Sequence, residues 1–291
     1  YHLKAAGTEN WPLMNQAIAR IDAARRRGVD VTADIYPYIR NGIGLTAFVP
    51  PWHYAEGAPA FFPKLSDPAL RLKIRRELEA PPTGWDNWYR HVGQNWDKVL
   101  ITGAGSYPDR KIVGLSILGA ARHSGKDVWD FFFELLPKGI SLAPESMNEE
   151  QKHLALRTPW VMIETDTAPV NPATVTSTHP RAFGAFPRVL AKYVREENIL
   201  PLEDAIRRMT SLTANRLGLH DRGRIGVGLA ADMVIFDPEK IQDRATFEEP
   251  LQYAEGVDYL LINGDLVIDD RRITGAMPGK VLRHGRAATG N

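Results

Sequence analysis

The sequence predicts an α/β protein with parallel strands, followed by a smaller, mainly β unit. Strand, helix and strand patterns alternate within the first 38 residues, and an apolar strand from Trp160 to Thr165 precedes several helical segments. Alternation of this kind is typical of parallel βαβ units. After Gly218, glycines and short strand patterns replace the helices. We therefore expect a domain boundary near Leu219, with units at 1–218 and 219–291.

The first unit opens on Tyr1 to Lys4, which we interpret as the tail of a strand. A helix is predicted from Asn10, its N-cap, to Arg27, with Gly28 as the stop signal. The alternating pattern of residues 29–38 predicts the next strand. Two Pro-Pro pairs and several tryptophans interrupt this pattern between about residues 42 and 96.

Regular structure is predicted again further along the chain. We expect a strand over 98–102, helices over 113–123 and 128–136, a strand over 160–165, a loop over 167–180, and helices over 185–197, 202–209 and 211–217.

The second unit is predicted to be a partial β-sandwich. Short strands are expected over 233–236, 257–262, 265–268 and 280–283, and Asn263-Gly264 is a strong hairpin signal. A two-sheet sandwich usually needs roughly seven strands. We therefore expect the remaining strands to come from polypeptide that precedes Tyr1, so that the chain is a C-terminal fragment.

Composition excludes several classes of protein. Lys plus Arg number 36 and Asp plus Glu 35, so the net charge of +1 excludes a basic nucleic-acid-binding surface. The absence of cysteine excludes disulfides, thiolate ligands and a cysteine nucleophile from these residues. No apolar run reaches the ~18 residues of a membrane helix. We expect a cytoplasmic protein, although a signal peptide could precede Tyr1.

His2 and Lys4 share one face if the chain opens as a strand. At the mouth of a parallel barrel, His2 would be a neutral imidazole ligand for a metal and Lys4 a cation for an anionic substrate. The alternative is a frayed terminus whose side chains meet only solvent.

Asp34 and Tyr36 lie on one face at the end of the predicted strand. Tyr36 could donate a hydrogen bond to a substrate while Asp34 orients a neighbour. Alternatively, Asp34 caps a loop and Tyr36 packs with its hydroxyl in water.

Glu164 and Asp166 end an otherwise apolar strand. Burial of a carboxylate is costly unless it is paired, bound to metal or used as an acid or base. Asp166 is therefore the strongest catalytic candidate, and Glu164 a supporting residue. The alternative for Asp166 is a cap for the following loop.

Arg181 and His179 follow within reach of the same mouth. The planar guanidinium of Arg181 suits a substrate carboxylate, although a surface ion pair is the commoner use of arginine. His179 is a possible supporting residue. Gly103-Ala104-Gly105 lacks the further features of a dinucleotide site. We interpret the remaining histidines as ordinary surface or core residues: His53, His91, His123, His153, His220 and His284.

Taken together, these motifs resemble the N-acyl-D-amino-acid deacylases (D-aminoacylases) of the amidohydrolase superfamily over nearly the whole chain. The resemblance rests on blocks at His2–Gly7, Asp34–Tyr38, Glu164–Asp166, His179–Leu190, Met209–Leu212, Asp221–Ile225 and Ala231–Pro238.

The resemblance implies the C-terminal part of a zinc-dependent (β/α)8 TIM-type barrel and part of a small β-sandwich. In the family, the counterparts of His2 and Asp166 lie on the sixth and eighth strands as metal ligands, and that of Asp166 is also the acid/base. The counterparts of Lys4, Tyr36 and Arg181 hold the carboxylate of an N-acyl amino acid. One or two zinc ions are implied, and their other ligands would precede Tyr1.

Length predicts where an insertion lies in such a barrel. Two βα units occupy about 62 residues, and His2 and Asp166 are separated by far more. The excess of roughly 100 residues falls within about 42–158, and we expect it to cover the active-site mouth as a lid.

The expected function is zinc-dependent hydrolysis of the amide bond of N-acyl-D-amino acids, with the fragment inactive alone. A small-molecule substrate is expected, and neither nucleic acid nor membrane. The alternatives are a hydantoinase-like or dihydroorotase-like enzyme acting on cyclic amides, or a non-catalytic binding module if the gene begins near Tyr1.

Overall fold

The computed structural model describes residues 1–81 and 84–283 of the chain. The longer helices and the strands, in chain order, are α1 (Leu13–Arg26), β1 (Ala33–Ile35), β2 (Ile43–Gly44), α2 (Ala58–Phe61), α3 (Pro68–Glu79), α4 (Trp88–His91), β3 (Val99–Gly103), α5 (Ile117–His123), α6 (Val128–Leu135), β4 (Ser141–Pro144), α7 (Glu149–Leu156), β5 (Val161–Ile163), α8 (Arg181–Arg188), the π-helix η8 (Val189–Glu196), α9 (Leu202–Met209), α10 (Ser211–Arg216), β6 (Met233–Phe236), β7 (Val257–Ile262), β8 (Asp265–Asp269) and β9 (Arg272–Ile273).

Two short parallel strands form the centre of the molecule. β1 pairs with β5, with Asp34 opposite Met162, and the backbone N–H of Glu164 extends the ladder by donating to Ile35 at 3.0 Å. Leu3 lies on the other side of β1, where its N–H donates to the carbonyl of Asp34 at 2.8 Å. Because parallel strands end at the same edge, the residues that follow β1 and β5 come together there.

The opening residues are not a strand. His2 has a φ of +39°, in the left-handed region, which interrupts the extended backbone. The prediction of a strand tail at Tyr1 to Lys4 is therefore wrong as secondary structure, although Leu3 does lie beside β1.

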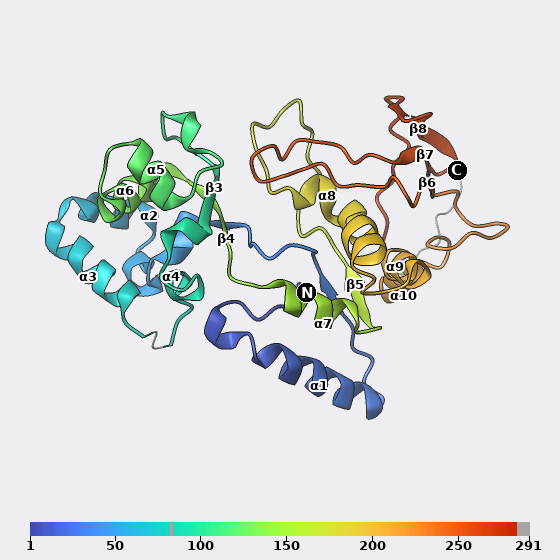
Figure 1. The fold of residues 1–291 in the computed structure, drawn as a ribbon, viewed down its shortest axis with the longest axis horizontal. Helices are drawn as coiled ribbons and strands as arrows, with labels where there is room; N and C mark the ends of the chain where they lie inside the picture. Colours follow the sequence, from blue (N-terminus) through green and yellow to red (C-terminus); the bar gives the residue numbers. More distant parts are fainter. Residues whose placement is uncertain (82–83, 284–291) are drawn as a thin grey trace.

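An inserted lobe, defined here as residues 43–144 from β2 to β4, stands beside the central strands. Figure 1 shows it as a separate body to the left of α8 and α9. β4 pairs antiparallel with both β2 and β3, and the small helices α2 to α6 lie beside this sheet in Figure 1. The sequence predicted β3, α5 and α6 but not α2 and α3, which lie in the proline- and tryptophan-rich stretch.

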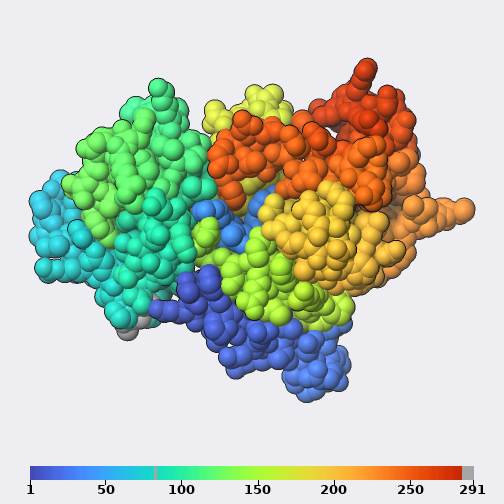
Figure 2. Space-filling view, viewed as in Figure 1, coloured from blue at the N-terminus to red at the C-terminus, as the bar shows by residue number. Residues whose placement is uncertain are grey.

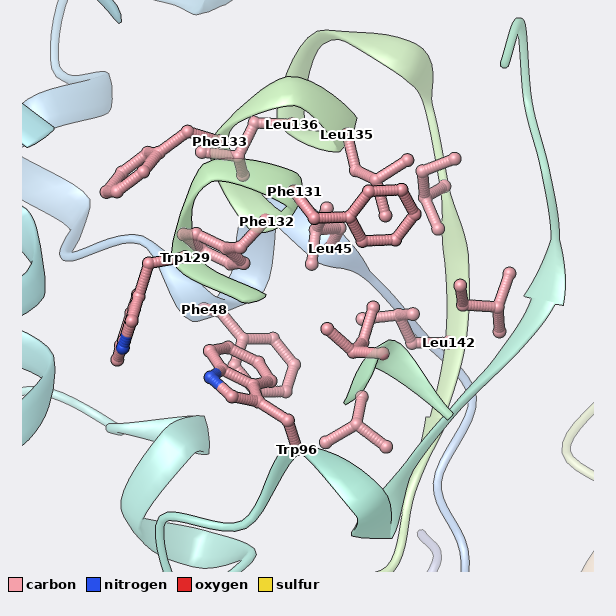
Figure 3. Close-up of a cluster of buried hydrophobic side chains, with 14 of the residues drawn as sticks. Leu45, Phe48, Trp96, Trp129, Phe131, Phe132, Phe133, Leu135, Leu136 and Leu142 are labelled. Carbon is pink, nitrogen blue, oxygen red and sulfur yellow. The ribbon is translucent and has the colours of Figure 1, made fainter. Parts of the chain in front are cut away.

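The lobe has a hydrophobic core of its own, drawn from residues 45–142. Aromatic rings dominate it, and Trp96 stacks on Tyr89 with ring centroids 4.5 Å apart while also packing against Phe132. Figure 3 shows Trp96 and Phe48 beside the aromatic side chains of α6. Buried aromatic rings remove large apolar areas from water, so this lobe does not depend on the central strands for its core.

A second core joins β1 and β5 to the helices around them. Met14 of α1, Ala155 of α7 and Tyr193 of η8 contribute fully buried side chains to it. Pro187 lies inside α8 and cannot donate a helical hydrogen bond, and the helix continues beyond it as the π-helix η8. Gly184 allows α8 to approach the strand end, because a Cβ there would lie 2.3 Å from the hydroxyl of Tyr38.

The C-terminal sheet has the order β6-β7-β8-β9 and is antiparallel. The predicted bounds of β6 and β7 are confirmed, and the Asn263-Gly264 hairpin joins β7 to β8. The predicted strand over 280–283 is wrong, because that segment has no ladder partner, and β9 forms instead. No helix in the described part of the chain is long and apolar enough to span a membrane.

Candidate active site

The candidate active site lies at the edge where β1 and β5 end. β5 leads into Glu164 and Asp166, β1 leads into Tyr36, and α8 begins with Arg181. The structure therefore brings together side chains that are far apart in the sequence. In Figure 2 a hollow separates the inserted lobe from the remainder of the molecule.

Asp166 and Arg181 form an ion pair at the centre of this site. Asp166 Oδ2 lies 2.9 Å from Arg181 Nη1, and the side chain of Arg181 is only 9% exposed. The buried Nε and Nη1 atoms of Arg181 have no hydrogen-bond partner among the described residues, although Nη1 lies within ion-pair distance of the carboxylate. A buried cation with free donors is suited to binding an anion.

Asp166 has a left-handed backbone conformation, with a φ of +49°. Such a conformation costs a non-glycine residue roughly 1–3 kcal/mol and is commoner at functional sites. Its Oδ1 atom accepts a hydrogen bond from the hydroxyl of Tyr1. Donating this bond raises the pKa of Tyr1 to about 12, with burial adding to the effect.

Tyr36 is surrounded by cations. The ammonium of Lys4, the ammonium of Lys152 and the guanidinium of Arg181 lie 4.9, 4.8 and 4.6 Å from the centre of its ring. Lys4 Nζ also donates to the Tyr36 hydroxyl at 3.2 Å, as does Asn41 Nδ2 at 3.3 Å. Tyr36 is almost completely buried, and this burial raises its pKa above the usual value. Its hydroxyl therefore stays protonated.

Burial lowers the pKa values of Lys4 and Lys152, whereas it raises that of Tyr36. It lowers the pKa of Lys4 to about 8, although the negative charge of Asp166 opposes the change. It lowers the pKa of Lys152 to about 7, with a further contribution from the charge on Lys4, while Glu149 and Glu164 oppose it. The interior disfavours a charged ammonium unless an anion pairs with it.

Sequence reasoning missed Lys152. The residue lies in α7, is 1% exposed, and contacts the sulfur of Met147 at 3.3 Å. Its neighbours in the sequence are ordinary for an amphipathic helix, so no local motif identifies it. Only the packing of α7 against β1 and β5 places it at the site.

Glu164 is the third carboxylate at this edge, after Asp34 and Asp166. Burial, together with the negative charges of Asp34 and Asp166, raises its pKa to about 7. Its Oε1 atom is buried without a hydrogen-bond partner among the described residues. A buried oxygen without a partner can accept a hydrogen bond from a ligand or bind a cation.

His2 and Asp34 are linked through the backbone. The N–H of His2 donates to Asp34 Oδ1, so the Asp34 carboxylate holds the backbone at His2. Burial and then the charge of Lys4 lower the pKa of His2, which favours the neutral imidazole that binds metals.

His179 has a structural position beside Arg181. Its Nδ1 accepts the backbone N–H of Arg181 at 3.1 Å, and its Nε2 lies 3.3 Å from the carbonyl oxygen of Arg40. Burial, with the charge on Arg181, lowers its pKa to about 3, so it is neutral. Since Nδ1 already accepts a hydrogen bond, His179 positions the first turn of α8 and does not offer a free lone pair to a metal.

His91 lines a pocket together with His2 and Lys4, and three other histidines pair with acids. His53, His123 and His153 lie 2.6 to 2.9 Å from Glu77, Asp109 and Glu197. His284 lies outside the described residues. Among those described, no three His, Cys, Asp or Glu side chains are grouped so that they could hold a metal.

Comparison with known proteins identifies related sequences. Residues 152–268 match the model of the Amidohydrolase family. The D-aminoacylase of Alcaligenes xylosoxydans xylosoxydans is 31% identical over 97% of this chain, and the N-acyl-D-glutamate deacylase of the same organism is 30% identical over 99%. These matches cover 47% and 49% of those two proteins, so the chain spans about half the length of the curated relatives it matches.

Solved structures give the same result. A D-aminoacylase with a binuclear metal centre superimposes with a TM-score of 0.70 at 29% identity, over 97% of this chain and 48% of that protein. The N-acyl-D-glutamate deacylase of Bordetella bronchiseptica, solved with zinc and a phosphonate inhibitor, matches equally well. The chain belongs to the amidohydrolase family and is similar, over nearly its whole length, to its D-aminoacylases.

Proposed function

We propose that the protein of which these 291 residues are part hydrolyses the amide bond of N-acyl-D-amino acids, with zinc as its metal. The observation that carries the proposal is the contact between the Asp166 carboxylate and the buried, incompletely bonded guanidinium of Arg181. If Asp166 is the acid/base and Arg181 the binding group for the substrate carboxylate, the two groups would lie directly beside each other. The names of the relatives support the same class of substrate.

The proposed architecture is a (β/α)8 barrel to which this chain contributes the last strands. We assign the segment at His2 to the sixth strand, β1 to the seventh and β5 to the eighth. The parallel pairing of β1 with β5 supports this order. The sheet β6 to β9 would form part of a small sandwich, and the insertion at about 42–158 would cover the mouth as a lid.

The donor set at the strand edge fits part of a zinc site. His2 supplies an imidazole and Asp166 a carboxylate, both common zinc ligands, and Glu164 leaves a buried oxygen without a partner. A catalytic zinc needs about three protein ligands. We propose that His2 and Asp166 are two of them and that polypeptide outside residues 1–291 supplies the others, in keeping with the greater length of the relatives.

Zinc bound there would polarise the acyl carbonyl and make a water molecule more acidic. The residues of this chain would do the remaining work. Asp166 accepts the proton of the attacking water and delivers it to the leaving amine, so the amide is split into a carboxylate and a free amino acid. Arg181 and Lys4 bind the carboxylate of the substrate, and the protonated hydroxyl of Tyr36 donates a hydrogen bond to it.

Purified full-length protein tests this proposal. It should release amino acid from N-acetyl-D-amino acids, much less from their L-enantiomers, and not open hydantoin or dihydroorotate. A chelator should abolish the activity and zinc should restore it. Residues 1–291 alone should be inactive. Hydrolysis of cyclic amides in place of N-acyl-D-amino acids would identify the alternative enzyme class. If the metal-bound protein hydrolyses none of these compounds, a binding module would be favoured.

A further inference from the structure

A cavity of about 900 Å³ lies between the inserted lobe and the start of α8. The lobe contributes Ile43, Thr102, Arg110 and Ser141 to its wall, and the opposite side carries Arg181. The guanidinium proposed to bind the substrate carboxylate therefore also borders a chamber large enough for the rest of a small substrate.

The polar groups of this cavity are cationic or neutral. Among the described residues that line it, there are two arginines, several hydroxyl groups and neither aspartate nor glutamate. The Nε of Arg181 and the hydroxyl of Ser177 are buried there without hydrogen-bond partners. Unpaired buried donors beside a cavity point to a ligand with negatively charged oxygens.

Arg110 has a defined position on the cavity wall. Its Nη1 donates to the carbonyl of Gly105 at 2.7 Å, and Gly105 packs so closely against the chain that a Cβ would lie 1.9 Å from the carbonyl oxygen of Lys138. The adjacent acid, Asp109, is instead paired with His123 at 2.9 Å. Among the described residues Arg110 forms no ion pair, so its charge is available to a ligand.

Apolar side chains complete the wall. Ile43, Val113 and Leu142 line the same cavity as Arg110. Such a lining suits methylene groups that end in a carboxylate, because the apolar surface packs against the carbons while the guanidinium meets the charge.

We propose that this cavity receives the side chain of the substrate amino acid and that Arg110 binds a carboxylate at its end. The inference rests on the proposed function and specifies its substrate class as N-acyl-D-amino acids with an acidic side chain. In this arrangement Arg181 binds the α-carboxylate and Arg110 binds the second carboxylate, while the scissile amide faces Asp166.

Steady-state kinetics of the full-length protein and its Arg110→Met variant test the assignment. N-acetyl-D-glutamate and N-acetyl-D-glutamine are suitable substrates, since they differ in the charge of the side chain and hardly in its size. The unmodified enzyme should prefer the glutamate compound. Arg110→Met should lower kcat/KM for it by roughly 10- to 100-fold, the range expected for hydrogen bonds to a charged group, and by less than about threefold for the glutamine compound.

Lys111→Met is the matched control, because Lys111 is the exposed neighbouring cation and does not line the cavity. It should leave both substrates unchanged. Equal losses for both substrates in Arg110→Met, an equal effect in Lys111→Met, or no preference for the acidic substrate in the unmodified enzyme would each overturn the proposal. The proposal would also be overturned if Arg110→Met lowered kcat/KM only for N-succinyl-D-leucine, because that compound carries its second carboxylate on the acyl group and not on the side chain.

Calorimetric binding separates this inference from the proposed function. In an Asp166→Asn background, N-acetyl-D-glutamate should bind at least about tenfold more tightly than N-acetyl-D-glutamine, and Arg110→Met should remove the difference. If this binding difference is found but the unmodified protein has no amidase activity, the cavity assignment stands and the proposed function is wrong. Equal binding of the two compounds would refute the cavity assignment whatever the activity.

Discussion

Arg181 Nη1 lies 2.9 Å from Asp166 Oδ2, so the proposed carboxylate-binding group and the proposed acid/base are in direct contact. A substrate carboxylate would compete with Asp166 for the same guanidinium. Binding of the substrate would then loosen the ion pair and leave Asp166 free to accept a proton. In the proposed mechanism, the contact would link binding of the substrate carboxylate to the availability of the base.

Replacement of Asp166 by asparagine should abolish turnover without unfolding the protein. The amide retains the shape of the side chain but cannot accept the proton, and general base catalysis contributes about 10²- to 10⁴-fold. We expect kcat to decrease by a factor within that range and the thermal unfolding temperature to change by only a few degrees. Near-normal kcat on an N-acyl-D-amino acid would contradict the assignment of Asp166.

Replacement of Arg181 by methionine should raise KM for substrates with a free α-carboxylate. The lost hydrogen bonds to a charged group correspond to roughly 10- to 100-fold. The methyl ester of the same substrate, which lacks the charge, serves as the control and should be affected much less. An equal loss on acid and ester would show that Arg181 has only a structural role.

Replacement of Gly42 by alanine should impair Arg181 without touching a reacting group. The added Cβ would lie 3.2 Å from Arg181 Nη2, closer than ordinary contact, so the guanidinium must shift by a few tenths of an ångström. We expect KM to rise by about two- to tenfold with little change in kcat. Gly44→Ala is the control, because its Cβ would meet Thr46 Oγ1 at an ordinary 3.7 Å. Identical kinetics for the two variants would argue against the close approach.

Replacement of Lys152 by methionine should stabilise the protein in a pH-dependent manner. Burial lowers the pKa of Lys152 from 10.5 to about 7, so the folded state holds this proton more weakly than the unfolded state does. The cost to stability is largest below pH 7, decreases as the pH rises and is absent above about 10.5. Since each pKa unit corresponds to about 1.4 kcal/mol, methionine should gain a few kcal/mol near pH 6.5.

Urea unfolding of the full-length protein at pH 6.5, 8.5 and 10 checks this prediction. The difference between Lys152→Met and the unmodified protein should shrink steadily across the three values. Lys73→Met, at an exposed position on α3, should change the free energy of unfolding by less than about 0.5 kcal/mol throughout. A pH-independent difference at Lys152 would mean that packing, and not charge, accounts for the effect.

The sequence predicts local structure well where a short motif determines it. Asn263-Gly264 adopts positive φ at both residues, as the hairpin requires, and the flanking strands β7 and β8 begin as predicted. The segment over 280–283 is also predicted as a short strand, on its apolar Val281-Leu282 pair, but it pairs with no strand. Strand formation depends on a partner, which periodicity cannot supply.

The candidate site shows a similar division. Asp166, Tyr36 and Arg181 could be proposed from the sequence because each lies at the end or start of a predicted element, and the structure brings their side chains together. Lys152 could not, because its burial arises only when α7 packs against the central strands. The position of Arg110 likewise follows from the tertiary contact of the lobe with α8. The assignments of the metal ligands remain predictions.

Because the two hydrophobic cores are separate, substitutions in one part of the protein can accumulate during evolution without disturbing the other. The wall that carries Arg110 belongs to the aromatic-rich lobe, whereas Asp166 belongs to strands with their own core. Substitutions that reshape the lobe wall need not disturb the reacting groups. Selection could therefore alter the proposed substrate preference while the proposed hydrolytic chemistry is inherited unchanged.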